Sequence, residues 1–226
     1  MTDRAGLAAV LFDMDGTLLD SREALIGAYH DATTAVLGAP FPVERADVDH
    51  IIQLSARDAF PEIAGGDPEL ARRIEAVFHD SYLARSQEVR LYDGVAEMLG
   101  ALRDRGLALG IATSKSRPRL DLDLARTGIG GLLGTTICGD EVPIAKPDPA
   151  PLRAAMHALG VDPGETLYVG DGANDVVAAH AAGTRAAGVA YGFHPAACRA
   201  AGPEHWIERP LDLVDLAGVL GHVGAP

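Results

Sequence analysis

Residues 7–18 read LAAVLFDMDGTL, an apolar run that ends in two aspartates, Asp13 and Asp15. A run of this length bounded by Gly16 is typical of a central strand in a parallel sheet, because such a strand is buried on both faces. Open α/β sheets form their active sites at the carboxyl ends of their strands. The sequence therefore predicts a buried strand that ends in two carboxylates at the edge where sites form.

The two aspartates point to chemistry, although a structural interpretation exists. They are two residues apart, so on extended backbone their side chains face the same way. Like charges held together either raise a carboxyl pKa or bind a cation, and both are features of functional sites. The alternative is an ordinary acidic turn in which Gly16 supplies the bend.

The composition is that of a folded, acidic protein. The chain has 226 residues, of which 48% are apolar and 23% charged, enough for one large core with or without a smaller inserted domain. Its formal net charge of −13 opposes binding to nucleic acid or to an anionic membrane. Its two cysteines make no disulfide framework, and the N-terminal apolar run is too short to span a membrane. We expect a soluble cytoplasmic protein, either a monomer or a homodimer.

After about residue 91 the chain alternates apolar strands with amphipathic helices, which is the pattern of βαβ units. The predicted strands cover residues 108–112, 135–138, 166–170, 185–189 and 205–207. Helices are predicted at 149–159, between an Asp148 cap and Gly160, and at 212–220. The predicted fold class is α/β, with a doubly wound, Rossmann-like parallel sheet as its core.

Residues 19–90 show helical periodicity without convincing strands. Helices are predicted at 23–37, 45–60 and 68–85. We therefore expect a helical cap domain, residues 19–90, inserted into a core domain made of residues 1–18 and 91–226. Two connections would join the domains, as a moving lid requires; the alternative is that these helices pack on one face of the sheet.

Three further polar clusters follow later strands. Thr113 and Ser114 come directly after the predicted strand 108–112, where hydroxyls beside the free N–H groups of a helix form a phosphate-sized anion site; the alternative is an ordinary helix N-cap. Lys146, one of only two lysines in the chain, lies in a loop stiffened by two flanking prolines. Its ammonium can screen an anion, and a solvated surface lysine is the alternative.

The third cluster, GDGAND at residues 170–175, repeats the arrangement of a strand followed by an acid. Mg²⁺ prefers hard oxygen ligands and takes only one or two protein carboxylates, so Asp13 and Asp171 suffice together with a backbone carbonyl. Asp175 would orient these ligands from behind. The alternative is a glycine-rich turn whose acids favour the N-terminus of the following helix.

Four such clusters, in this order at the ends of separate strands, resemble the motifs of the haloacid dehalogenase (HAD) superfamily of phosphohydrolases. The motifs stand here as DMDGT at residues 13–17, Thr113-Ser114, Lys146-Pro147, and Gly170-Asp171 with Asp175. The resemblance runs from about residue 7 to residue 220, and its first and fourth motifs are highly specific.

The resemblance implies a Mg²⁺-dependent phosphatase that works through an aspartyl phosphate. Asp13 would be the nucleophile, and Asp15 would protonate the leaving oxygen and then activate water. The metal would be held by Asp13, Asp171 and the carbonyl of Asp15. Supporting residues would be Asp175, Gly16 and Thr17.

The same resemblance assigns the phosphate-binding residues. Thr113 or Ser114 would bind the phosphoryl oxygens together with Lys146, which also counts among the catalytic residues. Family precedent places the hydroxyl at the first residue after the strand, which favours Thr113.

Within the superfamily, the chain looks most like phosphoglycolate phosphatases and neighbouring pyrophosphatases, so a small phosphorylated metabolite is the expected partner. Asp15 argues against the dehalogenases proper, in which that acid is replaced. The lack of any lysine before Lys115 argues against phosphonoacetaldehyde hydrolases. β-Phosphoglucomutase-like phosphoryl transfer and pyrophosphate hydrolysis remain as alternatives.

The cap sets specificity in this superfamily, and residues 50–57 here read HIIQLSAR, where relatives often carry glycine before the substrate-facing loop. Possible substrate contacts in the cap are Arg57, Gln53 and His50. Side chains that only meet solvent are the alternative for all three.

A two-component receiver domain also combines strand-end acids, a hydroxyl residue and a lysine around Mg²⁺. It keeps its phosphoaspartate, whereas an acid two residues after the nucleophile promotes hydrolysis, and it has no helical insertion of this size. This non-enzymatic phosphoacceptor interpretation is therefore disfavoured.

Overall fold

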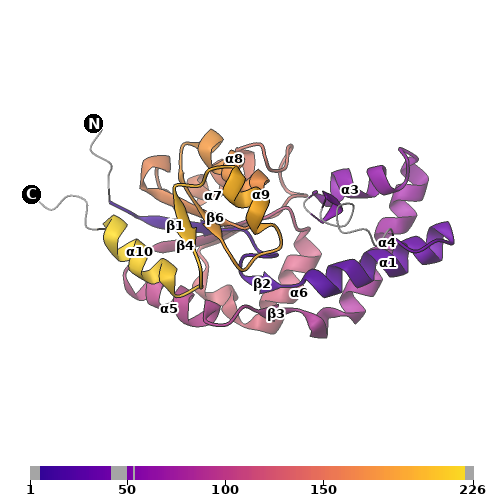
Figure 1. Ribbon diagram of the computed structural model, residues 1–226, viewed down its shortest axis with the longest axis horizontal. Helices are drawn as coiled ribbons and strands as arrows, with labels where there is room; N and C mark the ends of the chain where they lie inside the picture. The colour runs from indigo at the N-terminus through magenta and orange to yellow at the C-terminus, as the bar shows by residue number, and fades with distance from the viewer. Residues whose placement is uncertain (1–5, 42–49, 53, 222–226) are drawn as a thin grey trace, which may run out of the picture.

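The computed structural model describes residues 6–41, 50–52 and 54–221. Its centre is a six-stranded parallel sheet in the order β5-β4-β1-β6-β7-β8 (Figure 1). The strands are β1 Ala9–Phe12, β4 Ala108–Ala112, β5 Thr135–Ile137, β6 Thr166–Gly170, β7 Arg185–Val189 and β8 His205–Ile207. The predicted α/β class with a doubly wound parallel sheet is confirmed.

The predicted strand boundaries hold for four of the later strands and fail by one residue for β5. This strand ends at Ile137, whereas the prediction extended it to Cys138. The N–H of Cys138 donates instead to the carboxylate of Glu141, at 2.9 Å, which takes the residue out of the ladder.

β1 lies at the centre of the sheet, between β4 and β6. Its side chains alternate between two apolar cores: Val10 and Phe12 belong to one, and Leu11 belongs to the other. From β1 the chain first passes to β4 and β5 and then returns to β6 on the opposite side. The topological switch point, where ligands bind in open α/β sheets, therefore lies at the carboxyl end of β1.

Helices cover both faces of the sheet (Figure 1). One face carries α7 Ala150–Leu159, α8 Ala173–Ala182 and α9 Pro195–Ala200, and the other carries α5 Val95–Asp104, α6 Arg117–Thr127 and α10 Asp212–Gly221. Short 3₁₀ turns stand at η2 Ile129–Leu132 and η3 Pro163–Glu165. Both faces of the central strands are thus buried, which explains their unbroken apolar sequence.

The inserted helices, called the cap from here on, are α1 Arg22–Leu37, α3 Ala56–Ile63 and α4 Pro68–Ala84, followed by the turn η1 Ser86–Glu88. They lie beyond the end of the sheet at which β1 ends, and not on either face of it (Figure 1). Aromatic rings hold them together: the centroids of Tyr29 and Phe78 are 4.4 Å apart, and those of Phe60 and Phe78 are 5.2 Å apart.

Two short strands form where the chain enters and leaves the cap. β2 Leu19–Asp20 and β3 Arg90–Leu91 pair antiparallel with each other. The sequence did not predict them, because two residues are too few for an alternating pattern. They lie at the two predicted connections, although the division into domains 19–90 and 1–18 with 91–226 stays a prediction.

The helix predictions need correction at their ends. Helix α1 begins one residue before the predicted 23–37, α4 ends one residue before the end of the predicted 68–85, and α10 ends one residue after the predicted 212–220. The predicted helix 45–60 lies partly outside the described residues, and where it is described the chain is not helical from residue 54 to residue 55, so α3 starts anew at Ala56. Helix α7 begins one residue later than predicted, at Ala150, after Pro149; the Asp148 carboxylate still accepts the Ala150 N–H at 2.8 Å. Within the described residues, every helix is too short or too polar to cross a bilayer.

Candidate active site

The four predicted motifs meet at the carboxyl ends of β4, β1 and β6. Asp13 directly follows β1, and its N–H donates to Val169 O at 2.9 Å, which continues the ladder. Thr113 follows β4 and donates its N–H to Ile137 O at 3.0 Å. Asp171 follows β6. Because the three strands are adjacent and parallel, their first residues beyond the sheet lie side by side.

A tight turn after Asp15 closes around Asp171 and requires glycine. Gly16 has φ +78°, a left-handed conformation that favours glycine. A Cβ atom there would come within 2.3 Å of Asp171 Oδ2. Thr17, the next residue, is buried, and its hydroxyl has no hydrogen-bond partner among the residues described.

Lys146 links the nucleophile candidate to the fourth motif. Its Nζ lies 2.9 Å from Asp13 Oδ1 and 2.7 Å from Asp175 Oδ1, and it donates to the hydroxyl of Tyr168 at 2.9 Å. Burial acts to lower the pKa of Lys146, but Asp13 and Asp175 outweigh it and raise the pKa well above its ordinary value. Lys146 is therefore a fixed, buried cation and not the solvated surface lysine of the alternative.

The carboxylate of Asp13 is buried next to both a cation and a second carboxylate, which have opposite effects on its pKa. Burial raises its pKa, and Asp175 adds to the rise, while Lys146 and the hydroxyl of Thr113 oppose it. The net effect is a pKa above the ordinary value for aspartate. Ser114 also lines the cavity in front of Asp13.

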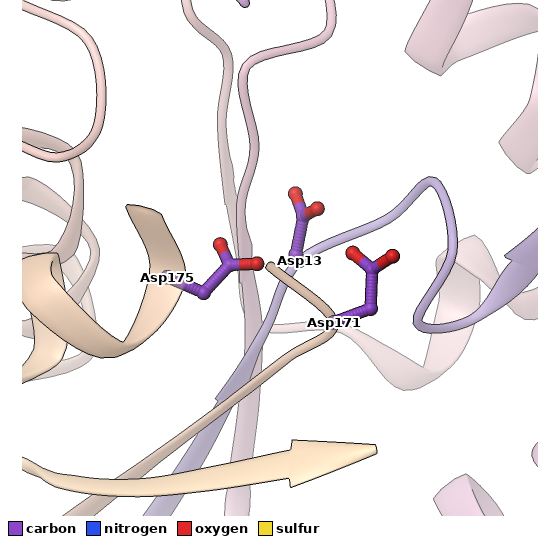
Figure 2. A group of neighbouring side chains, drawn as sticks. All are labelled: Asp13, Asp171 and Asp175. Carbon is purple, nitrogen blue, oxygen red and sulfur yellow. The ribbon is translucent and has the colours of Figure 1, made fainter. Parts of the chain in front are cut away.

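Three carboxylates converge in a group that could hold a metal ion. Asp13, Asp171 and Asp175 each offer an oxygen within 4.8 Å of the others (Figure 2). Burial raises the pKa of Asp171 well above its usual range, and the charges of Asp175 and Asp13 add to this, against a 2.7 Å hydrogen bond from Phe193 N. Such a group of hard oxygens, destabilised by mutual repulsion, suits a divalent cation such as Mg²⁺.

The net charge around the cavity supports this fit. Among the described residues that line it, four are aspartates, namely Asp13, Asp15, Asp171 and Asp175, against the cations Lys115, Arg119 and Lys146. The cavity therefore has an excess of carboxylates, which a bound cation would offset. Both oxygens of Asp175 are already engaged, by Lys146 and Tyr168 on one side and by the Gly172 N–H on the other. This favours the supporting role predicted for Asp175.

Asp15 has a different set of partners from Asp13. Its Oδ1 accepts from Lys115 Nζ at 2.7 Å and from the hydroxyl of Ser21. Burial acts to raise the pKa of Asp15, but the charges of Lys115 and Arg119 outweigh it, and the net pKa lies below its ordinary value. The Asp15 side chain is not in the carboxylate group of Figure 2, so only its backbone carbonyl is left for the predicted metal contact.

Lys115 is itself buried among polar partners from both parts of the fold. Besides Asp15 it contacts Asp123 on α6 and donates to the hydroxyl of Tyr82 on α4, at 3.0 Å. Tyr82 in turn donates to Asp123 at 2.9 Å. Sequence reasoning noted Lys115 as rare but gave it no role, and it missed Asp123 and Tyr82 because both contacts depend on tertiary structure.

Among the described residues, the cap side chains that line the cavity do not include the predicted His50 and Arg57. His50 is exposed and pairs with Glu62 at 2.9 Å. Arg57 donates to the backbone oxygens of Pro143 and Val142 in the core, and Gln53 lies outside the described residues. The cap side chains that line the cavity belong to Leu25, Tyr29, Ile52, Leu54 and Ala56.

The cavity has a volume of about 60 Å³. This is room for roughly four to six water molecules, so only a small group fits without movement of the cap. The core contributes its charged wall, and the cap contributes an apolar one.

Comparisons with known proteins give this geometry a context. Residues 10–189 match a family model described as haloacid dehalogenase-like hydrolase. The pyrophosphatase PpaX of Bacillus velezensis is 37% identical over 221 residues, which cover 97% of this chain and 100% of that protein. An N-acetylmuramic acid 6-phosphate phosphatase of Pseudomonas aeruginosa is 36% identical, with 94% of this chain and 96% of that protein covered.

Similarity extends to phosphoglycolate phosphatases. One from Pseudomonas putida is 36% identical over 195 residues, which cover 82% of this chain and 70% of that protein. A crystal structure described as a predicted phosphoglycolate phosphatase from Haemophilus somnus superposes with a TM-score of 0.83 at 26% identity, covering 96% of this chain and 99% of that one.

Proposed function

This chain belongs to the haloacid dehalogenase-like hydrolase family and is a phosphoric monoester hydrolase, and we propose that it is a Mg²⁺-dependent phosphatase of small metabolites. The observation that carries the proposal is the convergence of Asp13, Asp171 and Lys146 at the switch point of the sheet. A nucleophile, a metal ligand and a fixed cation are the parts that phosphoryl transfer requires.

Asp13 would attack the phosphorus atom, forming an aspartyl phosphate while the bond to the leaving oxygen breaks. Lys146 and the hydroxyl of Thr113 would bind the phosphoryl oxygens, with Ser114 beside them. A bound Mg²⁺, held by Asp13, Asp171 and the Asp15 carbonyl, would supply positive charge that offsets the charge on these oxygens. Fixed charges of this kind supply most of the catalysis in phosphoryl transfer.

Asp15 would carry the protons. It would give a proton to the leaving oxygen, and it would later take one from the water that attacks the aspartyl phosphate and regenerates Asp13. The lowered pKa of Asp15 leaves it ionised at rest, which suits the second of these steps. For the first step, Asp15 must first take up a proton from solvent, which requires that the bound substrate weaken the contact between Asp15 and Lys115 and so raise the pKa of Asp15.

The preferred substrate would be a small phosphate ester, 2-phosphoglycolate being the leading candidate. The small volume of the cavity in front of Asp13, about 60 Å³, supports a small substrate. The relatives named above act, by their names, on phosphoglycolate, pyrophosphate and N-acetylmuramic acid 6-phosphate. Each of these compounds carries a second anionic group beside the transferred phosphoryl group.

A second candidate function is hydrolysis of pyrophosphate, because the B. velezensis pyrophosphatase is 37% identical along its whole length. Mutase activity has less support. The two described cap residues that were predicted as possible substrate contacts, Arg57 and His50, are engaged elsewhere and do not line the cavity.

A substrate panel tests the proposal. Purified protein is assayed with Mg²⁺ on 2-phosphoglycolate, pyrophosphate, hexose phosphates, nucleotides and β-glucose 1-phosphate, with phosphate release and sugar-phosphate isomers measured separately. We expect phosphate release, fastest from 2-phosphoglycolate or pyrophosphate. Interconversion of glucose phosphates without net release of phosphate would instead identify a mutase.

A further inference from the structure

Three lysine or arginine side chains of the described part of the chain line the cavity, and among the described residues only two of them are paired with carboxylates. Lys146 is neutralised by Asp13 and Asp175, and Lys115 by Asp15 and Asp123. The third is Arg119, in the first turn of α6. Within the described ranges, no carboxylate forms an ion pair with it, and its one hydrogen bond runs from Nε to the hydroxyl of Ser116, at 3.2 Å.

Arg119 is nevertheless buried, with 7% of its surface exposed. An arginine removed from water without an ionic partner is costly, so such residues are rare unless something compensates them. The rings of Phe78 and Tyr82 on α4 lie 5.2 and 5.5 Å from its guanidinium carbon and supply part of that compensation. Ring faces leave the in-plane N–H donors of the two terminal nitrogens unused.

Arg119 lies on the side of the cavity where the leaving group would bind, and not on the side of the transferred phosphoryl group. Arg119 lines the same cavity as Asp15 and Tyr29. It packs against the ring of Tyr82, whose hydroxyl accepts from Lys115, the partner of Asp15. Asp15 is the residue proposed to serve the leaving oxygen. Lys146, by contrast, lies on the side of Asp13 and Asp175.

We propose that Arg119 binds a second anionic group, a carboxylate or a phosphate, on the leaving-group part of the substrate. The inference rests on the proposed phosphatase function and narrows its substrate class. Arginine suits both anions because its planar donors match two oxygens at once. A substrate with this second charge gains a charge-assisted hydrogen bond that a neutral ester of similar size lacks.

A pair of matched esters tests the proposal. 2-Phosphoglycolate and 2-hydroxyethyl phosphate differ mainly in a carboxylate replaced by a CH₂OH group. We expect the wild-type kcat/KM to favour 2-phosphoglycolate by about 10- to 100-fold, the range expected for hydrogen bonds to charged groups. Arg119→Gln reduces this ratio to about threefold or less, and Arg119→Lys retains an intermediate ratio. Pyrophosphate, measured alongside, shows whether the second anion is a carboxylate, a phosphate or either.

Arg126→Gln is the matched control. Arg126 also lies on α6 and also contacts the cap side, through Ser86 Oγ, but it does not line the cavity. Its substitution leaves the ratio between the two esters unchanged. A wild-type ratio near one, or an unchanged ratio in Arg119→Gln, would overturn the proposal.

Two further measurements separate this inference from the phosphatase proposal and from misfolding. Turnover of p-nitrophenyl phosphate reports the phosphatase function alone. Calorimetric titration of Asp13→Asn with 2-phosphoglycolate and with inorganic phosphate needs no turnover. In this Asp13→Asn background, Arg119→Gln weakens the binding of 2-phosphoglycolate about tenfold or more, and Arg119→Lys weakens it less. Both substitutions change the binding of inorganic phosphate much less. Equal weakening for both ligands would contradict the assignment.

Discussion

The chain's two lysines, Lys146 and Lys115, have similar sets of partners. We call the surroundings of Lys146 the fixed half of the site, because the core alone forms them, and those of Lys115 the adjustable half, because the cap contributes to them. Each ammonium holds one aspartate of the first motif: Lys146 holds Asp13, and Lys115 holds Asp15. Each also contacts a second buried aspartate and the hydroxyl of a tyrosine. Yet the pKa of Asp13 is raised and that of Asp15 is lowered.

The two tyrosines explain what the difference means for function. Tyr168 comes from β6, so the Lys146 centre is complete within the sheet. Tyr82 comes from α4, so the Lys115 centre needs the cap for completion. The surroundings of Asp13, the proposed nucleophile, are therefore set by the core alone, whereas those of Asp15, the proposed proton carrier, depend on where the cap lies.

Of the substitutions that test the difference between the two halves, removal of the charge of Lys146 should have the largest effect on activity. We expect Lys146→Met to lower kcat for p-nitrophenyl phosphate about 10²- to 10³-fold, because a donor to the transferring phosphoryl group is lost. It also leaves Asp13 and Asp175 without their cation, so the free energy of unfolding should fall by about 3 to 5 kcal/mol. Thermal unfolding monitored by circular dichroism separates the two effects. A kcat within tenfold of wild type would remove Lys146 from catalysis.

Asp171 provides a second test of the fixed half, because within the described residues no lysine forms an ion pair with its carboxylate. Its folded-state pKa is raised, so without metal the protein loses stability as the pH rises from the ordinary aspartate value through that raised pKa. We expect Asp171→Asn to unfold at a higher temperature than wild type at pH 7 without metal. We also expect it to lose the stabilisation by Mg²⁺, about 2.7 kcal/mol at 100 times the Kd for the wild type.

Asp80 is an exposed residue of α4 that does not line the cavity. Asp80→Asn is therefore the control for this experiment, and it should leave both the metal-free unfolding midpoint and the Mg²⁺ shift as in wild type. If Mg²⁺ still stabilises Asp171→Asn by the wild-type amount, Asp171 is not a ligand.

Lys115→Met tests the adjustable half. Loss of its charge removes the main cause of the lowered pKa of Asp15, so that pKa should rise. The limb of the kcat/KM pH profile that reports Asp15 should therefore move to higher pH, and the maximal rate should fall about tenfold, less than for Lys146→Met. A profile that keeps both limbs in place, in a protein that circular dichroism shows to be folded, contradicts the role given to Lys115.

The two tyrosine hydroxyls give the smallest and most selective effects. Tyr82→Phe and Tyr168→Phe should each cost about 0.5 to 1.5 kcal/mol of stability and change kcat by no more than about threefold. Amide hydrogen exchange should rise along α4 in Tyr82→Phe only, because only that hydroxyl ties the cap to the core centre. Equal exchange in the two variants would show that the cap does not depend on the Lys115 centre.

The sequence predicted the fixed half of the site well, for a physical reason. Asp13, Thr113 and Asp171 follow buried strands directly, and the carboxyl ends of adjacent parallel strands must meet. Knowing the strands was therefore enough to bring these residues together. Lys146 followed from its motif, although its partner Tyr168 did not.

The adjustable half could not be predicted, because it depends on how helices pack. Lys115 reaches Tyr82 and Asp15, which are 33 and 100 residues away in sequence, and no local pattern records such contacts. The cap candidates His50 and Arg57 were predicted because they lie in the cap segment 50–57, yet neither side chain lines the cavity. Arg119 was overlooked because an arginine in a helix is normally solvated.

The central claim is that Asp13 acts with Mg²⁺ as the nucleophile of a phosphatase, and one assay tests it directly. Hydrolysis of p-nitrophenyl phosphate is measured for the wild type and Asp13→Asn, each with Mg²⁺ and with excess EDTA. We expect release of p-nitrophenol by the wild type with Mg²⁺ only, and none by Asp13→Asn in either condition. Turnover that survives EDTA, or that persists in Asp13→Asn, would contradict the account.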